Sequence, residues 1–251
     1  IVPPLSLEGP CLSIRKFRQK ALTEEDLIGG GSINTEAMEF LKQAVQARAN
    51  ILVSGATGAG KTTMLNALSQ YIFDGQRVVT IEDAAELQLQ HSHVVRLETR
   101  PPNNEGIGRV SARELLRNAL RMRPDRIIVG ESRGGEVLDM LQAMNTGHSG
   151  SMSTVHANSA EDAITRLEMM IGLSDFKGSD SLCQKMIGSA LDYIVHVGRL
   201  NDGQRVVKEI VKVSGKQAEL KPIFQFNEHT RALERVDQNG TAQAHVQEGL
   251  V

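Results

Sequence analysis

The sequence predicts an α/β fold built on a mostly parallel β-sheet with helices on both faces. First, short apolar runs alternate along the chain with stretches whose apolar residues recur at helical spacing. Second, a glycine-rich loop at residues 55–62 directly follows one such run and precedes a helical stretch. Third, 40% apolar and 23% charged residues are the composition of an ordinary globular protein.

The N-terminal part, residues 1–30, is expected to be the end of a truncated upstream lobe with its linker. Residues 12–17 alternate like a strand, and Gly29-Gly30-Gly31-Ser32 predicts a flexible break. Because the chain begins at Ile1, without a Met or a signal peptide, we expect its true N-terminal region to be missing. Apolar residues at helical spacing then predict an amphipathic helix over 35–48.

The middle of the chain supplies the alternation of strands and helices. Residues Ser111 to Glu114 form a capping box, which marks the start of a helix, and Ser159 is expected to start another. A further helical stripe consists of Leu138, Leu141 and Met144. Short apolar runs that predict buried strands lie at 51–53, 77–81, 94–97 and 126–129, with a weaker one at 151–155.

The C-terminal part changes character. Residues 192–225 resemble a β-meander in which Asn201-Asp202-Gly203 makes a hairpin turn. We therefore expect one core domain over 31–230, which ends in this meander. The polar residues 231–251 predict a loosely held tail.

The glycine-rich loop has the Gly-x-x-x-x-Gly-Lys-Thr pattern of a Walker A loop. Glycines let the backbone N–H groups wrap a polyphosphate closely, and the following helix adds its positive N-terminal end. Lys61 is expected to reach the β- and γ-phosphates, and Thr62 to offer a hydroxyl to Mg²⁺. The predicted nucleotide-binding residues are Gly55, Ala56, Thr57, Gly58, Ala59, Gly60, Lys61, Thr62 and Thr63.

Polar residues at the ends of neighbouring strands are expected to complete the site. Glu82 ends one predicted strand, and Glu131 ends another, in which Gly130 stands at the usual Walker B aspartate position. His156 ends a third strand, where its imidazole is placed to sense a γ-phosphate. Sheets of this kind bind ligands at the carboxyl ends of their strands, so we expect these side chains to converge on the loop.

Several longer segments resemble the secretion ATPase superfamily. They match, in order, its Walker A, Asp-box, Walker B and His-box motifs, and the resemblance is closest to the CpaF/TadA group, the motors of tight-adherence (Flp, type IVc) pili. The resemblance covers about residues 1–225. Beyond the Walker A loop, the segments that carry it are 81–87, 96–103, 118–125, 130–136, 144–148 and 156–158.

This resemblance implies a RecA-like P-loop NTPase core together with the C-terminal part of a smaller N-terminal α+β lobe. It implies Mg²⁺-dependent ATP hydrolysis that powers assembly or retraction of a pilus or a related secretion machine. The expected partners are copies of the chain in a homo-hexamer and platform proteins of the inner membrane. The expected location is cytoplasmic, peripheral at the inner membrane through those partners.

The resemblance also assigns catalytic roles. It places Glu82 as the general base that activates water and Glu131 as the acid that holds Mg²⁺ through water, although these two roles can be exchanged. Arg121 and Arg133 are the candidates for arginines donated to a neighbouring subunit's site, with Arg96 and Arg100 behind them. The alternative for each arginine is an ion pair on a charged surface. Ser132 replaces an expected apolar residue, which predicts looser packing behind Glu131.

Other functions remain as alternatives. A conjugation or type IV secretion traffic ATPase fits the same motifs, and so does a nucleotide-gated regulatory module with little turnover. A nucleic-acid motor is disfavoured, because the net charge is −2, aromatic residues are only 3% and Trp is absent. No apolar stretch approaches the roughly 18 residues that a membrane span needs.

Overall fold

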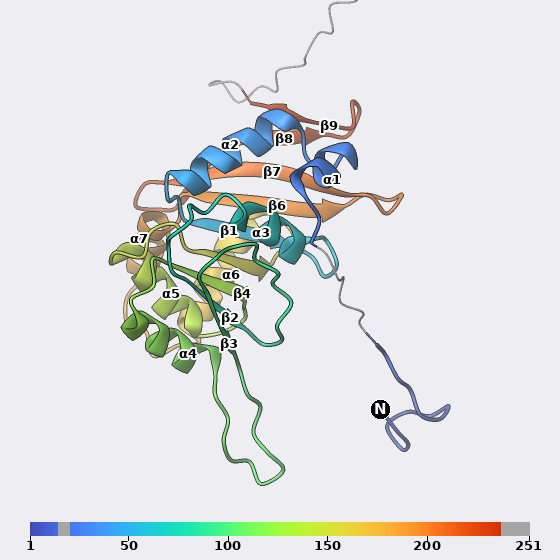
Figure 1. Cartoon of the computed structure of the whole chain (residues 1–251), viewed down its shortest axis with the longest axis vertical. Coiled ribbons are helices and arrows are strands. Elements are labelled where there is room, and N and C mark those ends of the chain that lie inside the picture. The colour runs from blue at the N-terminus through green and yellow to red at the C-terminus, as the bar shows by residue number, and fades with distance from the viewer. Residues whose placement is uncertain (15–20, 237–251) are drawn as a thin grey trace, which may run out of the picture.

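The computed structural model describes residues 1–14 and 21–236 of the 251-residue chain. These residues build a mixed β-sheet of nine strands in the order β3-β2-β4-β5-β1-β6-β7-β8-β9 (Figure 1). The strands are β1 (Ile51–Gly55), β2 (Val78–Glu82), β3 (Val94–Glu98), β4 (Arg126–Ser132), β5 (Met152–His156), β6 (Tyr193–Arg199), β7 (Arg205–Ser214), β8 (Glu219–Asn227) and β9 (Ala232–Arg235).

The parallel part of the sheet runs from β3 to β6 and places the functional edge. Strand β1 pairs with β5 on one side and with β6 on the other, and β4 joins β5 to β2. All residues of β1 and β2 are buried, as expected for short apolar strands covered on both faces. Because the strands are parallel, the carboxyl ends of β1, β2, β4 and β5 meet at one edge of the sheet.

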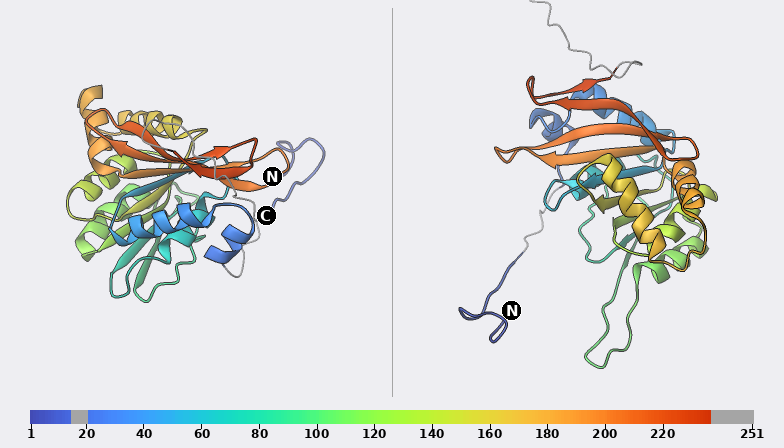
Figure 2. Two further views of the ribbon diagram at one scale, coloured as in Figure 1. Left: turned by 90° about the horizontal axis from the view of Figure 1, so that it is seen from above. Right: turned by 180° about the vertical axis from the view of Figure 1, so that it is seen from behind.

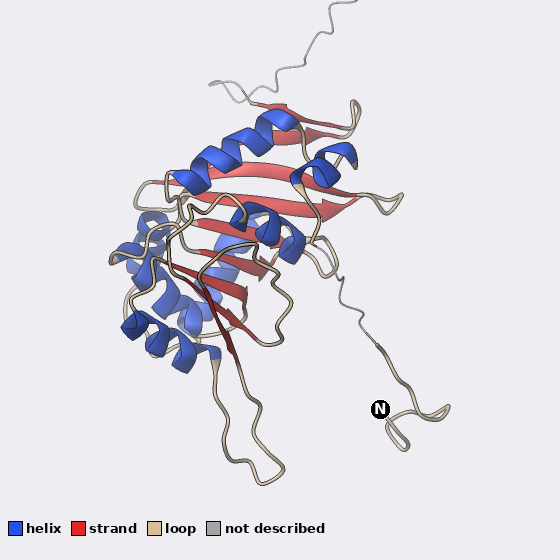
Figure 3. Cartoon of the chain, in the orientation of Figure 1, coloured by secondary structure: helices blue, strands red, loops and turns tan. Residues whose placement is uncertain are grey.

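Helices cover both faces of this sheet and create a hydrophobic core on each (Figures 2 and 3). One core contains side chains of α1, α2 and α3, and the other contains side chains of α4 to α7. No helix among the described residues has the length and apolar character needed to span a bilayer. The helices are α1 (Glu24–Gly29), α2 (Thr35–Gln46), α3 (Lys61–Ser69), α4 (Ala112–Ala119), α5 (Glu136–Asn145), α6 (Ala160–Gly172) and α7 (Asp180–Ala190), with a 3₁₀ turn, η1 (Leu120–Met122), after α4.

The predicted helix starts are confirmed by their caps. The Ser111 side chain accepts a hydrogen bond from the backbone N–H of Glu114, whose carboxylate accepts one from the Ser111 N–H in return. At the start of α6, the Ser159 side chain accepts a hydrogen bond from the backbone N–H of Asp162. These bonds satisfy backbone donors that have no partner within the helix, which explains why the helices begin at these residues.

The C-terminal meander extends the parallel sheet with antiparallel strands. Strands β6, β7, β8 and β9 pair in sequence order, and the predicted turn at residues 201–203 connects β6 to β7. Strand β9 lies within the expected polar tail, so the ordered sheet reaches past residue 231. The remainder of that predicted tail, 237–251, lies outside the described residues.

Some local predictions differ from the structure. Helix α7 was not predicted, and the glycines at 29–31 do not form an independent break, because Gly29 is the last residue of α1 and Gly30 is its C-cap. Residues 12–14 belong to no strand, while 15–17 lie outside the described residues.

Candidate active site

The Walker A loop connects β1 to α3, as the sequence predicted. Gly58 and Gly60 adopt φ angles of 73° and 106°, in the left-handed region that favours glycine. At Gly55 the restriction is steric, because an added Cβ would lie 2.4 Å from the backbone oxygen of Val197 on β6. Alanine is tolerated at the other loop positions, since the residues with demanding geometry are all glycine.

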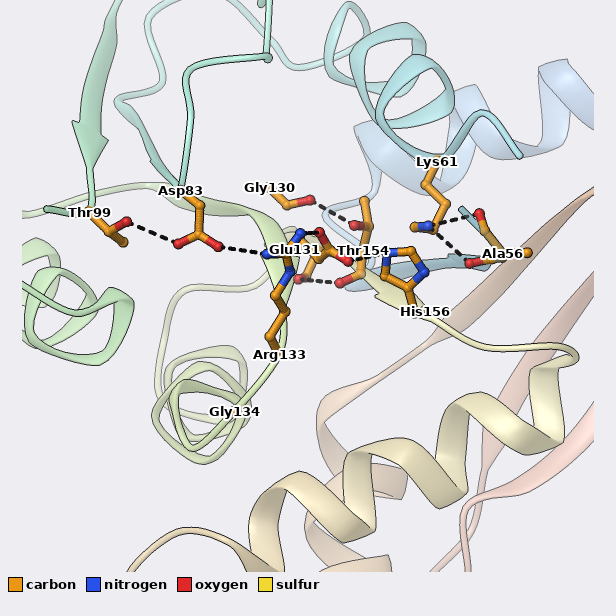
Figure 4. A network of polar contacts seen from close by, with 12 residues as sticks. Ala56, Lys61, Asp83, Thr99, Gly130, Glu131, Arg133, Gly134, Thr154 and His156 are labelled. Carbon is orange, nitrogen blue, oxygen red and sulfur yellow. Dashed lines mark hydrogen bonds and ion pairs between the residues drawn. The ribbon is translucent and has the colours of Figure 1, made fainter. Parts of the chain in front are cut away.

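Lys61 is the first residue of α3, and its side chain folds back over the Walker A loop. Its side chain is buried, and Nζ donates hydrogen bonds to the backbone oxygens of Gly55 and Ala56, each at 3.0 Å (Figure 4). This geometry places a positive charge beside the N-terminal end of a helix, where backbone N–H groups also point outward. The arrangement suits a polyphosphate, which would accept bonds from both sources.

A cleft of about 900 Å³ opens at the carboxyl ends of the parallel strands. Its volume falls within the range of small-molecule binding sites. Residues 57–63 of the Walker A loop and the start of α3 form one wall. The other walls come from the ends of β2, β4 and β5, from residues 21–32 before α2, and from the β6–β7 hairpin.

Glu82 ends β2 inside this cleft and is only 6% exposed. One carboxylate oxygen, Oε2, accepts hydrogen bonds of 2.8 Å from the backbone N–H groups of Glu86 and Leu87. Burial raises the pKa of Glu82 above its ordinary value, and these two hydrogen bonds oppose that shift. A buried carboxylate held rigidly in this way has the character of a general base.

Gly130 explains how Glu82 reaches its position. A Cβ added at Gly130 on β4 would lie 2.9 Å from Cγ of Glu82, which is closer than real Cβ contacts allow. The usual aspartate at this Walker B position would therefore collide with the Glu82 side chain on the neighbouring strand. Gly130 therefore leaves room for Glu82, and the acidic residue of this strand is the next one, Glu131.

Glu131 is the centre of a polar network across the ends of β4 and β5 (Figure 4). Its Oε1 lies 2.5 Å from Nε2 of His156, and its Oε2 contacts the guanidinium of Arg133. Arg133 also pairs with Asp83 at 3.3 Å, and Asp83 accepts a bond from the Thr99 hydroxyl at 3.0 Å. An irregular register between β4 and β5 at residues 129–132 accompanies this arrangement, as bulges often do near functional sites.

His156 has a lowered pKa, which favours the neutral imidazole. Burial is the largest cause and the positive charge of Lys61 is the next, while Glu131 opposes them. The ring atom of His156 that faces the Glu131 carboxylate is Nε2. His156 is therefore placed to connect the Glu131 carboxylate with the Walker A side of the cleft.

The predicted arginines do not share one location. Arg133 lies in the cleft of its own chain, where it pairs with Glu131 and Asp83. Arg121 is exposed on η1, before the amino end of β4, and does not line the cleft. Arg96 and Arg100 are exposed on and just after β3. A role for these residues in a neighbouring subunit's site stays a prediction.

Two details of the network were not predicted correctly. Asp83 and Thr99 received no role from the sequence, although both lie in segments that carried the resemblance; Asp83 directly follows Glu82. The predicted loosening at Ser132 is not seen, because its hydroxyl is buried and lies 2.8 Å from the hydroxyl of Ser153. A polar pair thus replaces apolar packing behind Glu131.

The residues fit ATP and Mg²⁺. The loop has the glycine backbone and the lysine that a polyphosphate needs, and Thr62 and Glu131 both line the same cleft. A hydroxyl and a carboxylate are oxygen ligands of the kind that Mg²⁺ prefers beside phosphates. Bound there, the ion would neutralise phosphate charge during transfer.

The fold and the site together define a P-loop nucleotide-binding protein. Over residues 2–249, the chain matches the model of a family described as Type II/IV secretion system protein. The chain belongs to this family. The predicted superfamily is therefore confirmed, while the closer placement in the CpaF/TadA group stays a prediction.

Known proteins of conjugation, secretion and pilus systems are similar to this chain. A putative conjugal transfer protein of Mycobacterium tuberculosis is 43% identical over 220 residues, which are 87% of this chain and 61% of that protein. The VirB11 ATPase of the Brucella suis type IV secretion system superposes with a TM-score of 0.64 at 35% identity, over 77% of this chain and 57% of that one. The pilus retraction motor PilT with bound ADP superposes with a TM-score of 0.60 at 28% identity, over 77% of this chain and 53% of that one.

Proposed function

We propose that the chain is the nucleotide-hydrolysing part of a motor that powers a secretion or pilus machine. The observation that carries the proposal is the convergence of Lys61, Glu82, Glu131 and His156 on one cleft. A phosphate-binding loop alone would suit any nucleotide-binding protein. Two carboxylates in contrasting environments beside that loop favour hydrolysis, because one can act as the base for the attacking water while the other holds the metal ion.

The contrasting environments also support an assignment of roles. Glu82 is buried, has a raised pKa and has no ion pair to a cation among those found in the described residues, which suits a general base for the attacking water. Glu131 lies between His156 and Arg133 and suits the carboxylate that holds Mg²⁺ through water. His156 would report the presence of the γ-phosphate to Glu131.

The machine that we propose is a tight-adherence (Flp, type IVc) pilus, with the chain as a homo-hexamer in the cytoplasm at an inner-membrane platform. The sequence resemblance to the CpaF/TadA group supports this choice. A role in conjugal transfer or type IV secretion is the second candidate, supported by the mycobacterial relative and the VirB11 likeness. The platform protein that co-purifies with the motor from its own cells distinguishes the two.

The chain spans only 61% of the length of that mycobacterial relative, so the hydrolysis test uses the full-length protein. We expect phosphate release per subunit to rise with protein concentration as the oligomer forms, because an arginine such as Arg121 would act in a neighbour's site. Phosphate release and molecular mass by light scattering are measured over one dilution series. A constant rate per subunit from monomer to oligomer would contradict the ring motor.

A further inference from the structure

The β6–β7 hairpin brings an arginine to the tip of the Walker A loop. Arg205 is the first residue of β7, at the functional edge of the sheet, and its Nε donates a hydrogen bond of 2.7 Å to the backbone oxygen of Gly58. Its Cδ lies 3.6 Å from the point where a Cβ on Gly60 would stand. The Arg205 side chain therefore packs along the loop that wraps the phosphates.

The hairpin is fixed at this position by contacts with two other parts of the chain. The Gln204 amide donates a 3.0 Å hydrogen bond to the backbone oxygen of Gly30, and Arg231 donates a 2.9 Å bond to the Gln204 side chain. The Val207 N–H donates to the backbone oxygen of Ser32 at 2.8 Å. Arg205 is thus carried by a supported element, which lowers the cost of holding its guanidinium at a ligand.

Arg205 differs from the other cations of the cleft wall in its partners. Arg133 already pairs with Glu131 and Asp83, and the Lys61 ammonium is bound by two loop oxygens. Arg205 also lines the cleft, yet no ion pair to an acidic side chain is found for it within the described part of the chain. Its hydrogen bond to Gly58 uses Nε, which leaves the two terminal amino groups of the planar guanidinium for an anionic ligand.

The sheet order indicates which end of a nucleotide this arginine meets. Glu131 and His156 lie on β4 and β5, on one side of β1, whereas β6 and β7 lie on the other side. The carboxylates and His156 belong at the γ-phosphate, where hydrolysis takes place. Arg205 belongs at the opposite end, beside the part of the cleft that Leu22 and Leu27 also line.

We propose that Arg205 is a nucleotide-binding residue whose terminal amino groups donate hydrogen bonds to the α-phosphate and ribose of bound ATP. This inference rests on the proposed nucleotide site and adds a contact outside the Walker A loop. Because the α-phosphate and the ribose are present in both ADP and ATP, Arg205 serves affinity for both. It acts on binding rather than on the hydrolytic step.

The test compares R205Q with R199Q in the full-length protein. Arg199 lies directly opposite Arg205 in the hairpin, is also exposed, and lines a separate cavity rather than the nucleotide cleft. R205Q is expected to weaken binding of a fluorescent ADP analogue about 10- to 100-fold, the value of a lost bond to a charged group. KM for ATP should rise in parallel, with kcat at saturation and the melting temperature unchanged.

Under the same conditions R199Q should bind ADP within about twofold of the wild type, as a surface change away from the ligand. An R205Q protein with wild-type ADP affinity would overturn the proposal, and so would an equal loss in R199Q, which would assign the effect to the hairpin. A loss confined to ATP would also overturn the placement at the α-phosphate. K61A separates these outcomes from failure of the nucleotide site itself: if the wild type binds no better than K61A, the proposed function fails.

Discussion

At the scale of single residues, the absence of a side chain at Gly130 leaves space for the Glu82 side chain. The missing Cβ on β4 gives the Glu82 side chain its space, because a methyl group there would lie 2.9 Å from Glu82 Cγ. Backbone hydrogen bonds to Oε2 then fix the carboxylate. The position of the Glu82 carboxylate therefore depends on a neighbouring strand and not only on its own strand.

Substitution G130A tests this contact. The added methyl group should displace Glu82, and a displacement near 1 Å can lower kcat about 100-fold. KM for ATP should change little, since the Walker A loop is not touched. The matched control is G172A, at the end of α6, where no atom lies within 4 Å of an added Cβ. A G130A protein with wild-type kcat would show that Glu82 does not need this space.

The proposed role of Glu82 predicts a pH dependence. A general base must be ionised, and burial raises the pKa of Glu82. As the pH falls through this raised pKa, the carboxylate takes up a proton and kcat should decline. The decline should therefore begin above the ordinary glutamate value of about 4.3.

Substitution E82Q should lower kcat about 10²- to 10⁴-fold and remove this acidic limb, while ATP affinity is retained. The measurement is kcat against pH for both proteins, with folding at each pH followed by circular dichroism. Either an E82Q protein with wild-type turnover or an acidic limb at the ordinary glutamate pKa would contradict the assignment.

At the scale of elements, helix α2 is attached to the antiparallel part of the sheet by aromatic packing. Phe224 on β8 is fully buried, and its ring centroid lies 5.7 Å from that of Phe40 on α2. Phe40 also makes an edge-on contact with Tyr193 on β6 at 5.3 Å. The C-terminal strands therefore stabilise the helix that follows the residues at the mouth of the cleft.

Substitution F224A should lower the free energy of unfolding by about 3–5 kcal/mol, the cost of removing a buried phenyl ring. The matched control is F73A, because Phe73 is 55% exposed and its removal should cost less than about 0.5 kcal/mol. Urea denaturation monitored by circular dichroism measures both values. Equal stabilities of F224A and F73A would contradict a structural role for the meander.

Much of this element structure could be predicted from the sequence, and the reasons for the failures are physical. The parallel strands are short apolar runs beside glycines or polar residues, and the helix starts carry explicit caps, so both gave strong local signals. The local sequence signal for helix α7 is weak, because its buried residues are only Cys183, Ile187 and Ala190. Strand β9 is four residues long and depends on pairing with β8.

The candidate site also has features that the sequence predicts and features that depend on the fold. Its residue types and their places at strand ends could be predicted from the motifs, because parallel strands bring their carboxyl ends together. The contacts between strands could not, since the fit of Glu82 over Gly130 and the pairing of Arg133 with Asp83 depend on tertiary packing. Arg205 belongs to no motif, and only the hairpin geometry places it at the loop.

At the scale of the whole molecule, the parallel and antiparallel parts of the sheet carry different parts of the site. Its parallel part carries the Walker A loop and the acidic residues, while its antiparallel part supports α2 and carries the β6–β7 hairpin to the cleft. Ala21, Leu22, Leu27, Gly30 and Ser32 also line the cleft, so the segment before α2 contributes to the site. The cleft is therefore lined by both parts of the sheet and by the preceding segment.

The central claim is that this cleft binds and hydrolyses ATP, and Lys61 tests it most directly. Phosphate release from ATP with Mg²⁺ is measured for the full-length protein and for K61A, with equal folding checked by circular dichroism. We expect the wild type to turn over and K61A to lose both hydrolysis and nucleotide binding, because the charge that the loop holds for the phosphates is gone. Identical rates of phosphate release from the two proteins would contradict the account.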